Sequence, residues 1–108
     1  MQVQIRLDID TGSGNYAIAG SAGVLPSTFK QLLDIAFGGQ LVDDFHRLDA
    51  NSMGSQIDGA IKSLQQDRRA YLGLTEVQIA FRPQVEAYLI GWRDLCRKHP
   101  GCYVSIVP

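Results

Sequence analysis

The first residues of the chain alternate strictly between apolar and polar side chains. The apolar positions are Val3, Ile5, Leu7 and Ile9, and the polar positions between them are Gln2, Gln4, Arg6 and Asp8. A period of two predicts a strand with one buried face and one wet face. Residues 11–15 contain glycine and asparagine, which tolerate positive φ, so they predict a turn. Residues 16–22 are expected to return as a second strand and complete a hairpin.

Helical spacing replaces this alternation in the middle of the chain. Residues 27–37 place apolar side chains three and four positions apart, between a Ser-Thr cap and a Gly-Gly stop. Residues 41–48 predict a second, short helix, and residues 49–54 predict a break. A longer apolar stripe predicts a third helix over residues 55–72.

The last third of the chain returns to strand patterns on either side of one helix. Alternation over residues 77–81 predicts a third strand, and Pro83 suits the first turn of the following helix. That helix is expected to end at residues 99–101, before a fourth strand over residues 102–107. The order ββ-ααα-βαβ predicts one α+β domain over residues 1–108. Its expected form is a two-layer sandwich, with helices covering one face of a four-stranded sheet.

The opposite face of this sheet would be polar. Its expected members are Gln2, Gln4, Arg6, Asp8, Gln78 and Arg82. Antiparallel sheets commonly keep one face in water, so solvation is the simpler interpretation. A docking or dimerisation surface is the alternative.

Composition excludes several classes of protein and names no single one. The chain has 108 residues, 45% of them hydrophobic, and a formal net charge of −1, so the basic excess of a typical nucleic-acid-binding domain is missing. No stretch reaches the roughly 18 apolar residues of a membrane helix, and two cysteines cannot build a disulfide framework. We expect a soluble cytoplasmic protein. No cofactor is expected, since no phosphate-binding or dinucleotide-binding glycine pattern is present.

The sharpest local pattern is the segment Ile9-Asp10-Thr11-Gly12-Ser13, which resembles the Asp-Thr-Gly motif of the aspartic proteases. Residues 89–95 are similar to the hydrophobic-hydrophobic-Gly segment and the following helix of the retroviral-type enzymes. The resemblance implies a homodimer in which two copies of Asp10 share one proton. The competing interpretation is a hairpin turn, and the helical pattern of the middle of the chain favours it.

A second pattern, Cys96-x2-His99-x2-Cys102, has a spacing compatible with zinc ligands. A structural zinc ion takes four ligands, and nothing in the sequence brings the fourth candidate, His46, close to these three. Cys96 also continues the apolar stripe of the helix and Cys102 begins the last strand, so core packing is the favoured interpretation. A disulfide between the two cysteines is a third interpretation, which a reducing cytosol disfavours.

A basic group on the last predicted helix completes the candidates. Arg93, Arg97 and Lys98 lie on that helix, and Arg68 and Arg69 are candidates to join them. They suit phosphate or an acidic protein, although a solvated helix face is the simpler interpretation.

We therefore expect a small non-enzymatic interaction module, such as an adaptor, a regulator or an inhibitor. Its partner would be another protein, and it would also form a homodimer. The candidate binding residues are Gln2, Gln4, Arg6, Gln78, Arg82, Arg93, Arg97 and Lys98. The alternatives are a dimeric acid protease that uses Asp10 and a weakly basic nucleic-acid-binding domain.

Overall fold

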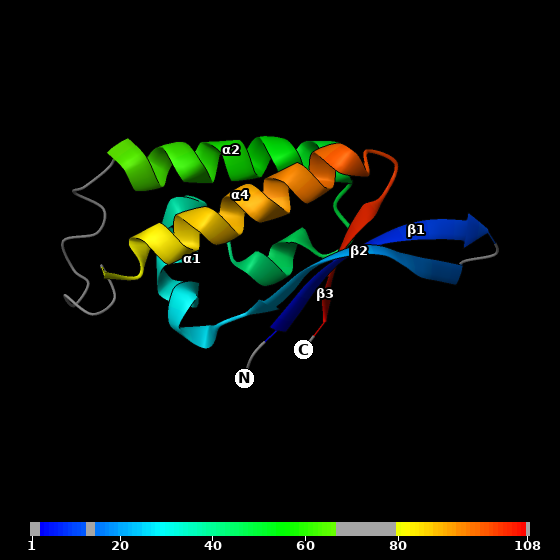
Figure 1. Cartoon of the computed structure of the whole chain (residues 1–108), viewed down its shortest axis with the longest axis horizontal. Coiled ribbons are helices and arrows are strands. Elements are labelled where there is room, and N and C mark those ends of the chain that lie inside the picture. The colour runs from blue at the N-terminus through cyan, green and yellow to red at the C-terminus, as the bar shows by residue number, and fades with distance from the viewer. Residues whose placement is uncertain (1–2, 13–14, 67–79, 108) are drawn as a thin grey trace.

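The computed structural model describes residues 3–12, 15–66 and 80–107. Its elements run in the order β1 (Val3–Gly12), β2 (Asn15–Leu25), α1 (Lys30–Ala36), α2 (Ala50–Gln66), α4 (Arg82–Lys98) and β3 (Tyr103–Val107) (Figure 1). Two short 3-10 helices, η1 (Ser27–Phe29) and η2 (Val42–Phe45), flank α1. Strands near both ends and helices between them confirm the α+β class.

The strands form an antiparallel sheet of order β2-β1-β3, so β1 is the central strand. The predicted alternation holds along its first half: Ile5 and Leu7 are fully buried, whereas Gln4 is exposed. In β3, Val104 and Ile106 lie opposite these two residues and are buried with them. These four side chains form the face of the sheet that the helices cover.

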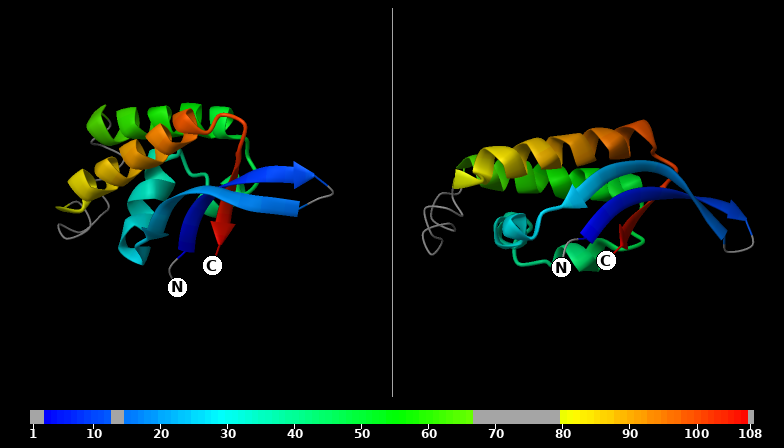
Figure 2. Two further views of the ribbon diagram at one scale, coloured as in Figure 1. Left: turned by 45° about the vertical axis from the view of Figure 1, so that its right-hand side comes forward. Right: turned by 60° about the horizontal axis from the view of Figure 1, so that its bottom comes forward.

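The hairpin is longer than the sequence indicated. Its strands continue to Gly12 and begin again at Asn15, where a loop of five residues was expected. Its distal end extends past the helices, as all three views show (Figures 1 and 2). Ile9 continues the apolar alternation of β1, yet 45% of its surface is exposed, because this part of the strand has no helix above it.

Two long helices cover the inner face of the sheet. α2 and α4 lie side by side and run antiparallel along it (Figure 1). Trp92 of α4 is fully buried, and Leu89, Ile57 and Met53 belong to the same core. The apolar stripes of both helices are therefore buried, as helical spacing predicts, because each helix turns one face toward the sheet.

α2 begins five residues before the predicted helix, at Ala50. The Asp49 carboxylate accepts the N–H of Ser52 at 2.9 Å and so caps the first turn. This hydrogen bond holds the pKa of Asp49 below its ordinary value. The expected break over residues 49–54 was wrong, because Ala50 and Met53 extend the buried stripe by a turn.

The expected four-stranded sheet was also wrong: in the part of the chain that the structure describes, the sheet has three strands. Residues 77–79 of the expected third strand lie outside the described residues. Phe81, at its end, has α-helical dihedral angles and leads directly into α4. The pattern misled because Phe81 is partly buried against the core as the residue before a helix.

Three glycines provide a test of this packing. A Cβ added at Gly59 in α2 or at Gly91 in α4 would meet no atom within 4 Å, whereas one at Gly20 would lie 2.8 Å from Leu95 Cδ1. We expect Gly59→Ala and Gly91→Ala each to stabilise the fold by up to ~1 kcal/mol, since alanine is the better helix former. Gly20→Ala should bring no such gain, because its Cβ fits only if the Leu95 side chain moves away. Chemical denaturation of the three variants measures both effects, and destabilisation by Gly59→Ala would contradict this placement.

Candidate functional site

The outer strand β2 is the most unusual surface feature of the described residues. It forms one edge of the sheet, and its eleven residues include no charged side chain and no proline. Natural sheets usually protect exposed edges with lysine, proline or a very short strand. β2 has instead two register shifts, at Ala19 and Ala22, and a third shift lies between Asp10 and Gly12 of β1, so Tyr16–Ile18 remains regularly paired with β1.

Exposed apolar side chains gather on this regular part of the hairpin. The exposed fractions are 61% for Ile18, 44% for Tyr16 and 45% for Ile9. Ile9 pairs with Ala17 across the hairpin, and Asp10 pairs with Tyr16. Paired residues point to the same face, so Ile9 and Ala17 share one face, whereas Tyr16 and Ile18 share the other. The distal hairpin therefore exposes apolar surface on both faces.

The opposite edge of the sheet is covered. Beyond β3, the Arg47 N–H donates to the Val104 carbonyl at 2.7 Å, and the Val104 N–H donates to the Leu48 carbonyl at 2.8 Å. The Ile106 N–H donates to His46 Nδ1 at 3.0 Å. The segment that follows η2 thus satisfies the outer backbone groups of β3. No corresponding backbone partner lies along Tyr16–Ser21 of β2 among the described residues.

A charged and aromatic cluster holds the exposed hairpin in place. The Arg47 guanidinium lies 3.5 Å from the Asp8 carboxylate and 4.2 Å from the centre of the Tyr16 ring. Tyr16 in turn meets the edge of Tyr103 at 6.4 Å between ring centres. Asp8 is only 3% exposed, so Arg47, together with Arg6, supplies the counter-charge of a carboxylate that water hardly reaches. The cluster fixes the direction of Tyr16, the first apolar side chain of the edge.

Arg47 maintains these contacts from a strained backbone conformation. Its φ is 71°, in the left-handed region that residues with a Cβ rarely adopt. Its backbone hydrogen bond to β3 and its side-chain contacts with the hairpin determine this conformation together. The inner half of the sheet and the exposed hairpin are therefore tied together through one residue.

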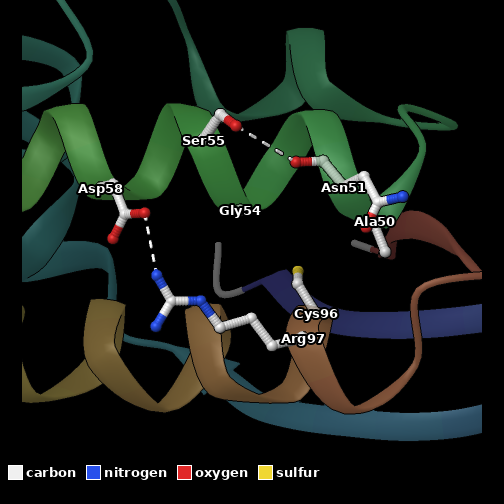
Figure 3. Close-up of a pocket in the computed structure, with 7 residues that line it drawn as sticks. All are labelled: Ala50, Asn51, Gly54, Ser55, Asp58, Cys96 and Arg97. Atoms are coloured by element: carbon white, nitrogen blue, oxygen red, sulfur yellow. Dashed lines mark hydrogen bonds and ion pairs between the residues drawn. The ribbon is translucent and has the colours of Figure 1, made fainter.

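A small pocket lies between α2 and α4 (Figure 3). Its volume is about 250 Å³, and it is lined by Ala50, Asn51, Gly54, Ser55, Asp58, Cys96 and Arg97. Arg97 and Arg93 both contact the Asp58 carboxylate, at 3.0 and 3.2 Å. Burial raises the pKa of the Cys96 thiol to about 12, so the thiol is protonated and unreactive at neutral pH. The charges in the pocket bind one another, which leaves it without a distinctive chemistry.

The same ion pairs account for the predicted basic group. Arg93 and Arg97 connect α4 to α2 through Asp58, and Lys98 ends α4 with an exposed side chain. Arg68 and Arg69 lie outside the described residues. The helix face is therefore largely neutralised, which weakens it as a phosphate-binding surface.

The other candidate binding residues do not form one surface. Gln4 is exposed on β1, and Arg6 lies on the same face, 3.9 Å from Asp8. Arg82 begins α4, a full helix length away from Lys98. Gln2 and Gln78 lie outside the described residues. The face expected to be uniformly open also contains the buried residues Asp8 and Ser105.

Asp10 lies at the distal end of the hairpin. Its carboxylate accepts the Gly12 N–H at 2.8 Å, and the Thr11 hydroxyl donates to the Asn15 carbonyl at 3.1 Å. Gly12 has a φ of 99°, which a glycine accommodates without strain. Side chains and glycine thus act here as turn-forming groups. The middle of the chain, which is extended in a retroviral-type protease, contains η1, α1, η2 and α2.

The cysteine–histidine pattern does not gather as a metal site. Cys96 and Cys102 are free and buried, and the described residues contain no cluster of three metal-ligating side chains. His99 is close to Gly20 instead, at the crossing of α4 and β2. The two thiols act as small apolar groups of the core.

Four residues of the exposed hairpin and its cluster escaped sequence reasoning: Tyr16, Ile18, Arg47 and Tyr103. The absence of charge from residue 15 to residue 25 was a usable signal for the edge strand. No local signal identifies Arg47, since its role depends on segments far apart in the chain.

Comparison with known proteins assigns no family. No protein-family model, no curated protein and no solved structure gives a significant match to the chain. Within the described residues, no helix combines the length and apolar character needed to span a membrane.

Two substitutions of Arg47 test the backbone strain apart from the side-chain cluster. Arg47→Ala and Arg47→Gly both remove the guanidinium, but only glycine fits a φ of 71° without cost. We expect the alanine variant to be less stable than the glycine variant by roughly 1 kcal/mol. Urea denaturation of the pair measures the difference. Equal stabilities would mean that Arg47 stores no backbone strain.

The buried thiol predicts loss of stability at alkaline pH. The pKa of Cys96 rises from 9.0 to about 12 on folding, so the unfolded chain loses this proton first as the pH increases. Between these values the free energy of unfolding should fall by roughly 1.4 kcal/mol per pH unit for this group. Tyr88, with a pKa raised from 10.0 to about 12, adds to the decrease at higher pH.

Denaturation curves measured across this range check the prediction. The Cys96→Ala variant should show a shallower decrease, because only the raised pKa values of Cys102 and Tyr88 remain to produce it. An identical pH dependence in the parent and the variant would contradict the assignment.

Proposed function

We propose that this protein is a small non-enzymatic interaction module that binds a protein partner by adding a strand to β2. Adaptor, regulator and inhibitor are roles of this kind. The supporting observation is the uncharged edge: β2 is the outer strand, it has no charged residue, and its regular part carries exposed Tyr16 and Ile18. Strand addition uses backbone groups for affinity and alternate side chains for specificity.

The contrast between the two edges of the sheet strengthens the proposal. The segment from His46 to Asp49 occupies the backbone groups of β3, whereas Tyr16–Ser21 of β2 has only β1 as a backbone partner among the described residues. An exposed, apolar edge without protective charges invites association, so its retention in a folded protein favours a role in binding. The cluster around Arg47 lowers the entropic cost of binding, because it orients Tyr16 before a partner arrives.

A lysine on the edge should abolish this binding. Ile18→Lys places a charge where a partner strand would pack, and Val24→Lys makes the same change on the same strand beyond both register shifts. Affinity capture from a lysate of the cells in which the protein naturally occurs should recover a bound protein when the parent or the Val24→Lys variant is the bait. Ile18→Lys should reduce that recovery about tenfold.

Hydrogen exchange on the captured complex supplies the second measurement. The amides of β2 should become protected on binding, since a partner strand would accept or donate hydrogen bonds there. Equal capture by both lysine variants, or protection confined to the helices, would refute binding at β2. Far-UV circular dichroism establishes that each variant retains its fold.

A further inference from the structure

The exposed part of β2 is complementary to itself. We propose that one partner of this edge is a second copy of the chain, and that two β2 strands pair antiparallel about a two-fold axis through Ala17. This inference rests on the proposed function, because it assigns an occupant to the same edge. A two-fold interface requires one patch to match itself, and the sequence around Ala17 meets that requirement on both faces.

On one face, the pairing places Tyr16 opposite Ile18 of the second copy, and it does so twice by symmetry. Both side chains are exposed in the single chain, at 44% and 61%. Pairs of an aromatic and a β-branched residue are among the favourable contacts between antiparallel strands. An axis through Tyr16, or one through Ile18, would instead place that residue opposite its own copy and lose the mixed pairs.

On the other face, the pairing joins two apolar rows into one. Ile9 lies opposite Ala17 within the hairpin. When Ala17 lies opposite its copy, the row runs from Ile9 through both Ala17 residues to the second Ile9. The small alanine side chains then meet at the axis, and the larger isoleucine side chains lie at the two ends. Tyr16 and Ile18 thereby gain direct neighbours from the second copy, and Ile9 becomes the outer member of a continuous apolar row.

Charge and shape also permit a second copy. Self-pairing brings identical groups close to one another, and like charges opposite each other destabilise a sheet. β2 carries no charge, and Asp8, opposite Ile18 in β1, is neutralised by Arg47 and Arg6. The distal hairpin extends past the helices, which leaves room for a second molecule beside β2 (Figure 2).

The register shift at Ala19 limits the paired stretch. Contact is therefore confined to the hairpin ends, and an interface smaller than about 1,000 Å² forms a weak, transient dimer. We expect a dissociation constant on the order of micromolar or weaker.

Analytical ultracentrifugation of the intact chain over a range of concentrations tests the dimer. The weight-average mass of the parent and of Val24→Lys should rise toward twice that of the monomer, whereas Ile18→Lys should stay monomeric. Register is tested with Ala17→Cys and a short thiol-specific bifunctional reagent, which should link two copies efficiently. Val24→Cys is the matched control and should not link, and the native thiols are buried.

Each result decides the proposal. A parent protein that is monomeric throughout, a dimer unaffected by Ile18→Lys, or no linkage through Ala17→Cys would overturn it. If lysate capture still depends on Ile18 in that case, the proposed function stands with a different protein as its partner. A dimer with the expected register and no captured partner would instead limit the edge to self-association.

Discussion

The structure depends on the burial of one face of β1. Ile5 and Leu7 are fully excluded from water, and their strand pairs with β2 on one side and β3 on the other. A side-chain period of two fixes the register of such a strand, because a shift by one residue would expose both apolar side chains. The helices α2 and α4 then add Trp92 and their own apolar stripes to the same core.

The two edges of this sheet differ in whether other segments of the chain cover their backbone groups. The segment after η2 bonds to the outer side of β3, so that edge is satisfied within the chain. β2 has no such cover among the described residues and no charge to discourage pairing. Arg47 links the two sides, since its backbone bonds to β3 while its side chain holds Tyr16 and Asp8. The covered edge thereby helps to organise the exposed one.

The charged and nucleophilic side chains of the pocket and of the hairpin turn are engaged within the fold. Asp58, Arg93 and Arg97 neutralise one another, and the Cys96 thiol stays protonated. Asp10 is engaged in its own turn. Each of these groups has a partner or an environment that accounts for its place in the fold. The exposed apolar side chains Ile9 and Ile18 have no comparable environment among the described residues, and the functional proposal is based on them.

Sequence patterns determined the parts of this protein that local periodicity controls. The first strand, the final strand, the stripe of α4 and the turn at Asp10 followed from residue spacing and turn chemistry. Patterns failed where context decides: Phe81 alternates like a strand residue but precedes a helix, and residues 50–54 look like a break but are helical. Asp49 explains the helical start of α2, because its carboxylate caps the first turn although Gly54 and the polar residues before it are typical of a break.

The tertiary structure alone decided which edge of the sheet is covered and which residues meet there. Arg47 and Asp8 are thirty-nine positions apart, and Tyr16 and Tyr103 come from opposite ends of the chain. Contacts at such separation depend on how the whole chain packs, so no local pattern records them. The sequence by itself determined that β2 carries no charge. Only the fold placed that strand at an edge, where the absence of charge has a physical consequence.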